Sequence, residues 1–309
     1  MQRAEADHYH QVTWSLTLHK ALPGATIHAM DDVPRVLVEQ ALTTLGVTEL
    51  APLRGGAQKA VSLVDRDGQR LVLKVISIGA SNPDSIKRAE REVELLSAIS
   101  SPYVVAVASE LIELGTPPTG AAWLEEFLDG DDLTPSLQSG PWTWNETARM
   151  ARDVAKGLGA AHAKRVVHRD LSPNNIRRLS NGSYKVMDFG FARHTLRSGL
   201  TIAGQPGTPG FASPEHLHNF SGAPTAASDV FCVGILMYTA LSGQNPIPYS
   251  GDDADYALRL INARTVDIAE HRPDLTDQQS SLIRKCLHPQ PARRYLNGNR
   301  LAQAVEELM

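Results

Sequence analysis

The chain has 309 residues, of which 42% are hydrophobic and 21% charged, and its formal net charge is −4. These values are typical of a soluble globular protein that is long enough for two lobes with separate cores. The slight acidity argues against a nucleic-acid-binding surface, and the longest apolar run, residues 230–241, is too short to span a bilayer.

Residues 1–46 precede any known motif. They begin with a stretch that contains acids and lacks the apolar core of a secretory signal. Residues 33–45 carry apolar side chains at helical spacing before Gly46, which predicts a helix with a glycine stop. We expect residues 1–46 to be an N-terminal extension of unknown role that packs on the small lobe. The alternative is a regulatory or partner-docking segment.

Residues 47–78 predict β-strands. An Asp-Gly turn at Arg66–Gly68 separates two alternating apolar runs, which is a strong hairpin signal. Gly55 and Gly56 mark an earlier turn. Lys74 stands inside the apolar run LVLKVI, where a lysine is costly to bury unless it is paired. The alternative for Lys74 is an edge-strand lysine that faces water.

Further helices and strands follow. In chain order, the pattern predicts a helix over 85–100, strands over 101–114 and 121–133, and a helix over 145–163. Thr143 is a candidate N-cap, and Glu146 three residues later completes a capping box.

The stretch VVHRDLSPNNIRRLSNGSYKVMDFG contains most of the chemically informative residues. The turn Asn181-Gly182 lies between two apolar runs and predicts a hairpin that folds Asp188 back beside Asn175. Asp170 precedes Asn175 by five residues. A cluster of carboxylate and amide oxygens suits Mg²⁺, which completes its ligands with phosphate oxygens and water.

HRD, then an asparagine five residues after its aspartate, then DFG resemble the catalytic core of the eukaryotic-like (Hanks-type) serine/threonine protein kinases. The resemblance covers about residues 47–309. It implies an α+β bilobal fold, with a small β-rich N-lobe that carries one main helix over about 47–126. A larger, mostly helical C-lobe would span about 127–309.

The resemblance also implies a role for each catalytic residue. Asp170 would accept or steer the proton of an attacking hydroxyl, and Asn175 and Asp188 would hold Mg²⁺. Lys74, fixed by Glu92, would orient the α- and β-phosphates of ATP.

The nucleotide site would include further residues of the N-lobe. Gly55, Gly56 and Val61 match the glycine-rich loop that covers the phosphates. Glu126 would begin the segment that joins the lobes, where adenine binds to backbone, and Glu125 would guard the back of the pocket.

Other matched positions would be structural or regulatory. Asp229 would hold the backbone of the catalytic loop, and Glu215 would form a buried ion pair with Arg294. Arg169 would bind a phosphate on the activation loop. The candidate phosphosites, for which ordinary loop hydroxyls are the alternative, are Thr195, Ser198 and Thr201.

Some positions depart from the family pattern. Arg54 and Lys59 replace the outer glycines of the loop, and Lys59 would add positive charge near the phosphates. Ser172 replaces a lysine that reaches the γ-phosphate, so either another cation compensates or turnover is slow. Ser213 replaces the alanine of the GTPxYxAPE-like segment.

These features predict a cytoplasmic kinase that uses ATP and Mg²⁺, with Mn²⁺ as an alternative, to phosphorylate serine and threonine in proteins and in its own activation loop. The expected partners are ATP and protein substrates, without nucleic acid or a membrane span; a regulator bound through residues 1–46 is the alternative role of that segment. A pseudokinase scaffold is the main alternative, favoured by the altered glycine loop and Ser172. A small-molecule phosphotransferase fits less well because GTPGFASPE resembles a peptide-docking segment.

Overall fold

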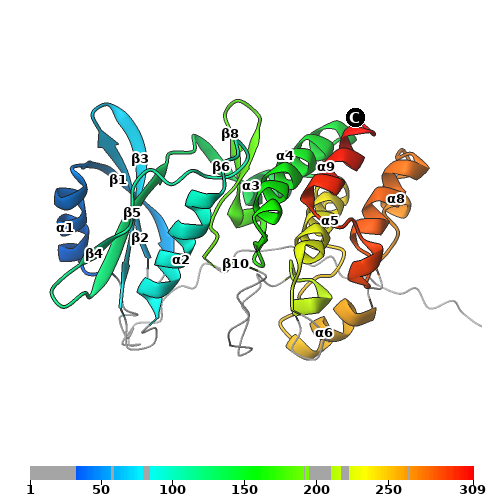
Figure 1. Cartoon of the computed structure of the whole chain (residues 1–309). Coiled ribbons are helices and arrows are strands. Elements are labelled where there is room, and N and C mark those ends of the chain that lie inside the picture. The colour runs from blue at the N-terminus through cyan, green and yellow to red at the C-terminus, as the bar shows by residue number, and fades with distance from the viewer. Residues whose placement is uncertain are drawn as a thin grey trace, which may run out of the picture.

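The computed structural model describes residues 33–56, 59–78, 84–190, 192–194, 210–216, 223–262 and 265–309. Within these residues the chain forms two lobes: a small one built on a sheet and a larger one that is mostly helical (Figure 1). The α+β bilobal fold implied by the resemblance is therefore confirmed.

The small lobe is organised around a five-stranded antiparallel sheet with the order β1-β2-β3-β5-β4. Its strands are β1 (Thr48–Gly56), β2 (Lys59–Arg66), β3 (Gln69–Ser77), β4 (Ile112–Leu114) and β5 (Gly120–Glu126). The predicted hairpin at Asp67-Gly68 joins β2 to β3, and both turn residues have positive φ, 52° and 84°. Such a turn matches the twist of the paired strands and fixes their register.

Two helices cover opposite faces of this sheet. Helix α1 (Arg35–Leu45) packs on one face against Leu71, Leu73 and other buried apolar residues. Helix α2 (Ser85–Ala98) packs on the other face, against Ile76 and Trp123, and lies between the sheet and the large lobe (Figure 1). Because side chains alternate along a strand, Lys74 points to the α2 face.

The large lobe is built around helices α4 and α5. Its helices are α3 (Leu133–Gln138), α4 (Trp144–Ala163), α5 (Ala226–Ser242), α6 (Asp253–Asn262), α7 (Ile268–His271), α8 (Asp277–Cys286) and α9 (Gly298–Glu306), with short 3₁₀ turns at Pro173–Asn175, Pro214–His216 and Pro291–Arg293. One large hydrophobic core joins them and extends to Leu95 and Leu96 of α2. The core thus ties α2 to the large lobe.

Small strands of the large lobe carry the stretch from HRD to DFG. Strands β6 (Gly130–Asp132), β8 (Ile176–Leu179) and β9 (Tyr184–Val186) form a three-stranded sheet, and β7 (Val166–Val167) pairs with β10 (Arg193–His194). The predicted hairpin is confirmed, since β8 and β9 are antiparallel and Gly182 in their turn has φ 81°.

Most predicted elements are confirmed. Helix α1 ends at Gly46, which is left-handed with φ 62°, and Thr143 and Glu146 form the predicted capping box of α4. The strand predicted over 101–114 is wrong for most of its length, because only 112–114 is a strand and Val104 and Val107 make isolated bridges. Among the described residues, no helix combines the length and apolar character that a membrane span requires.

Candidate active site

The loop that contains HRD is held by one buried carboxylate. Asp229, in the first turn of α5, accepts hydrogen bonds from the backbone N–H of His168 at 2.9 Å and of Arg169 at 3.0 Å. Its Oδ2 also lies 2.9 Å from Nε2 of His162. Burial alone would raise the pKa of Asp229, but these contacts lower it below its usual value. Asp229 therefore fixes the loop as a charged group, the contact that the resemblance implies.

His168 is enclosed by the same structure. Its ring packs on Phe189 with centroids 4.7 Å apart. Nδ1 accepts from the N–H of Asp170 at 3.3 Å, so Nε2 carries the proton and donates to the Met187 carbonyl at 3.1 Å. Both ring nitrogens are thus committed to backbone, as suits a residue that packs the loop.

Asn175 and Asp170 are joined directly. The side-chain Nδ2 of Asn175 donates to the carbonyl of Asp170 at 2.7 Å and to its Oδ2 at 3.2 Å. On the other side, the N–H of Met187 donates to the Asn175 carbonyl at 2.9 Å, which continues the β8–β9 ladder. The hairpin therefore brings Met187 against Asn175, and Asp188, which the sequence predicts beside Asn175, is the next residue.

Asp188 itself has an unusual backbone. Its φ is 60°, in the left-handed region, and its Oδ1 accepts from the N–H of Gly190 at 3.2 Å. A non-glycine residue in this region is uncommon and tends to occur where surrounding structure holds it, often at functional sites.

The donor atoms of Asn175 and Asp188 suit Mg²⁺. Because Nδ2 of Asn175 donates to Asp170, Oδ1 is the amide atom that remains available to a metal ion. A carboxylate and an amide oxygen are hard ligands, and the ion takes its other ligands from phosphates and water.

Lys74 is buried between two carboxylates. Its Nζ lies 3.4 Å from Oε1 of Glu92 on α2 and 2.7 Å from Oε1 of Glu125 on β5. Trp123 donates its indole N–H to the same Glu125 oxygen at 2.9 Å. Burial would lower the pKa of Lys74, but Glu125 and Glu92 together raise it well above its usual value. Lys74 is therefore a charged group, and the alternative of a water-facing edge lysine is wrong.

Lys59 joins the same cluster from β2. Its Nζ lies 3.6 Å from Oε2 of Glu92 and 3.9 Å from Oδ2 of Asp188. The positive charge of Lys59 is the main reason that the pKa of Asp188 falls well below its usual value. Burial, in contrast, raises the pKa of Glu92 although both lysines oppose it. The cluster holds three acids and two lysines, of which Glu92, Glu125 and Lys74 are buried and Lys59 and Asp188 are partly exposed.

The contacts of Glu125 and Lys59 are what sequence reasoning missed. The sequence places Glu125 at the back of the pocket but gives no partner for it. The signal lies in the strand register, since Lys74 is paired with Trp123 and Glu125 is two residues further along the same face.

The other positions predicted for the nucleotide site lie on strands of the small lobe. Val61 pairs with Lys74 across β2 and β3, and Gly55 and Gly56 belong to the end of β1. Glu126 accepts from the N–H of Ala106 at 2.8 Å and from Nζ of Lys185 at 2.5 Å. The candidate phosphosites Thr195, Ser198 and Thr201 lie outside the described residues.

Glu215 and Arg294 form the buried ion pair that the resemblance implies. Arg294 donates from its two terminal nitrogens to the two Glu215 oxygens at 2.7 and 3.0 Å. Nearby, His216 links Ser213 to the catalytic loop: its Nδ1 accepts from the Ser213 N–H at 3.1 Å and its Nε2 lies 2.9 Å from the Arg169 carbonyl. Burial lowers the pKa of His216.

Ser172 does not substitute for a cation. Its side chain is completely buried, and its hydroxyl has no hydrogen-bond partner among the described residues. The HRD loop therefore offers no charge from this position.

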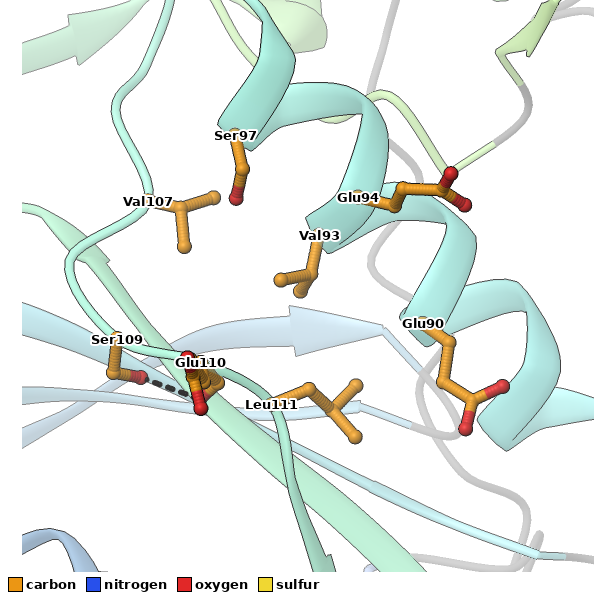
Figure 2. A pocket seen from close by; sticks show the side chains of 8 residues that line it. All are labelled: Glu90, Val93, Glu94, Ser97, Val107, Ser109, Glu110 and Leu111. Atoms are coloured by element: carbon orange, nitrogen blue, oxygen red, sulfur yellow. Dashed lines mark hydrogen bonds between the residues drawn. The ribbon is translucent and has the colours of Figure 1, made fainter.

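A separate hollow opens on another side of α2 (Figure 2). It has a volume of about 550 Å³ and lies between α2 and residues 107–111. In Figure 2, Val93 and Val107 point into the gap, and Glu90 and Glu94 of α2 are among the other residues that line it. The hollow shares no residue with the charged cluster.

Comparison with known proteins agrees with this fold. Residues 54–305 match the model of the protein kinase domain, so the chain belongs to the protein kinase family. Within that family it groups with the bacterial Hanks-type serine/threonine kinases.

Three relatives illustrate the similarity. The serine/threonine-protein kinase PknA of Mycobacterium tuberculosis is 30% identical over 257 residues, which cover 81% of this chain and 58% of PknA. The probable serine/threonine-protein kinase PknB of Lactococcus lactis is 28% identical over 247 residues, 78% of this chain and 37% of that protein. The serine/threonine-protein kinase drp72 of Corynebacterium efficiens is 31% identical over 231 residues, 73% of this chain and 43% of that protein. The chain thus spans no more than about three fifths of these relatives.

Proposed function

We propose that this chain is a protein kinase that uses ATP and Mg²⁺ to phosphorylate serine and threonine hydroxyls of proteins. The observation that carries the proposal is the joined pair of Asn175 and Asp170, with Nδ2 of Asn175 2.7 Å from the Asp170 carbonyl, next to the strand end that presents Asp188. The kinship with serine/threonine kinases supports the reaction class.

The roles follow from the groups present. Asp170 receives or steers the proton of the attacking hydroxyl, and its bond to Asn175 fixes its orientation. Asn175 and Asp188 would hold Mg²⁺, which would supply positive charge to the phosphates of the nucleotide. Lys74, anchored by Glu92, orients the α- and β-phosphates. Gly55, Gly56 and Val61 cover the nucleotide, and Glu126 begins the segment that binds adenine. Placement and charge stabilisation supply most of the acceleration.

Regulation and location are part of the proposal. Arg169 would bind a phosphate that the kinase adds to its own activation loop. Residues 1–46 would contact a regulatory partner, with α1 as their anchor on the sheet. Cys232 and Cys286 are buried thiols without a disulfide, in keeping with a cytoplasmic protein.

The second candidate is a binding scaffold without catalysis. Two observations favour it: Glu125 holds Lys74 at 2.7 Å, and the buried Ser172 adds no charge. A scaffold of this kind would bind partners through the kinase fold without transferring phosphate.

An assay with γ-labelled ATP and Mg²⁺ separates these functions. We expect the wild type to label itself or a generic basic protein on serine or threonine, and to leave small alcohols unlabelled. Asp188→Ala should lower transfer at least about a hundredfold, because a metal supplies several kcal/mol of transition-state stabilisation. Undiminished transfer by that variant at an unchanged melting temperature would refute the metal assignment, and an inert wild type would favour the scaffold.

A further inference from the structure

Two lysines, instead of one, face the candidate nucleotide site. Val61 of β2 pairs with Lys74 of β3, so Lys59, two residues before Val61, lies on the same face of the sheet as Lys74. Both ammonium groups approach one ring: Lys59 Nζ lies 5.4 Å and Lys74 Nζ 5.7 Å from the centre of Trp123. The two cations therefore belong to one cluster.

The two lysines differ in their carboxylate partners. Glu92 uses Oε1 for Lys74 and Oε2 for Lys59. Lys74 is held again by Glu125 at 2.7 Å, and its side chain is only 11% exposed. The side chain of Lys59 is 24% exposed, and its second partner is Asp188 at 3.9 Å. Lys59 is thus the more accessible cation and the one beside the proposed metal ligand.

The loop that contains HRD supplies no positive charge of its own between Asp170 and Asn175. Between Asp170 and Asn175 the sequence contains no basic residue, and Ser172 is buried. The terminal phosphate of a bound nucleotide therefore needs positive charge from another element. Lys59 is the first residue of β2, and lysine carries its charge on a flexible four-carbon stem.

We propose that Lys59 is a second phosphate-binding residue of the nucleotide site, an inference that rests on the proposed function. In this structure the Lys59 ammonium lies 3.9 Å from Oδ2 of Asp188. A divalent cation and an ammonium repel each other at one carboxylate. Lys59 therefore leaves Asp188 when a cation binds there and turns to the phosphates, while Lys74 stays with Glu125 and Glu92.

This exchange predicts two effects of opposite sign for one substitution. Without nucleotide, Lys59→Ala should bind Mn²⁺ more tightly than the wild type, by about tenfold, because the competing ammonium is gone. With Mg²⁺ present, the same variant should bind ADP and a non-hydrolysable ATP analogue about tenfold more weakly, and the analogue more so, because a charge-assisted contact is lost. A merely structural role would weaken both affinities.

Direct binding measurements decide the matter. Free Mn²⁺ is followed by electron paramagnetic resonance and nucleotide affinity by calorimetry, on the full chain. Lys59→Arg should restore nucleotide affinity, and Lys87→Ala, which removes an exposed lysine of α2, should match the wild type. In a Glu125→Met background, which releases Lys74, the nucleotide penalty of Lys59→Ala should shrink.

Two results would overturn the proposal: nucleotide affinity of Lys59→Ala within twofold of the wild type, or Mn²⁺ affinity that falls instead of rising. A wild type that binds Mg²⁺ and nucleotide but transfers no phosphate would refute the proposed function alone, since the binding comparison still decides the role of Lys59. The melting temperature of each variant shows that it is folded.

Discussion

Glu215→Gln should destabilise the large lobe more than any exposed charge change. Glu215 and Arg294 are buried, with side chains 4% and 0% exposed, and are joined by two hydrogen bonds. Arg294 also donates to the carbonyls of Ala227, His288 and Pro289 and lies 4.6 Å from the ring of Phe231. These contacts hold the guanidinium in place, so it cannot move to water when its carboxylate is removed.

The expected loss follows from the buried charge that remains. Removing one partner of a buried ion pair costs about 3–5 kcal/mol. For a chain of this size, 1 kcal/mol corresponds to roughly 2–4 °C in melting temperature, so a fall of about 6–20 °C is expected. Replacing both residues, Glu215→Gln with Arg294→Met, should recover part of this loss because no unpaired charge is left.

Urea unfolding followed by circular dichroism measures the effect. Arg259→Met provides the matched control, because it breaks an ion pair with Asp255 whose side chains are 49% and 40% exposed. Such exposed pairs contribute about 0–1 kcal/mol. If Glu215→Gln lost no more free energy of unfolding than Arg259→Met, the argument from burial would be wrong.

Three further predictions concern catalysis and pH. Glu92→Gln should lower kcat/KM at least about tenfold, because Glu92 holds both Lys59 and Lys74. Glu90→Gln, on the exposed side of α2, is the control and should keep the wild-type value. Equal kcat/KM for the two variants would refute the role of Glu92. Burial lowers the pKa of His216, so the unfolded chain binds the proton first, and stability should fall as the pH drops below about 6.5. Urea unfolding at pH 7.5 and 5.5 should show a smaller loss for His216→Gln than for the wild type, and identical losses would contradict it. The last prediction concerns the candidate phosphosites Thr195, Ser198 and Thr201. Changing all three to alanine should lower activity in the labelled-ATP assay, and an unaltered rate would remove the phosphate-binding role of Arg169.

Local patterns explain why so much of the fold could be predicted. The turns at Asp67-Gly68 and Asn181-Gly182 and the capping box at Thr143 are determined by neighbouring residues, and each has the expected geometry. The strand predicted over 101–114 failed because its apolar residues Val104 and Val105 are buried in the core of the large lobe without a continuous ladder. Apolar alternation reports burial, and burial does not require a strand.

In the candidate site, too, contacts between sequence neighbours could be predicted and contacts between distant strands could not. Motif spacing predicts Asp170, Asn175 and Asp188 as site residues, and the short hairpin of β8 and β9 places Met187, the residue before Asp188, against Asn175. The hold of Glu125 on Lys74 depends on the register between β3 and β5, whose paired residues are far apart in sequence. No local sequence pattern specifies such a register, so the contact between Glu125 and Lys74 could be found only in the structure.

Helix α1 has a practical consequence for any work on the isolated catalytic region. The family match begins at residue 54, within β1 and after α1. Yet Leu37, Val38 and Ala41 of this helix shield the outer face of the sheet. A fragment that begins at residue 54 would lack α1 and expose this apolar face of the sheet to solvent. An exposed apolar patch of this kind promotes self-association. Recombinant versions should therefore start no later than residue 33.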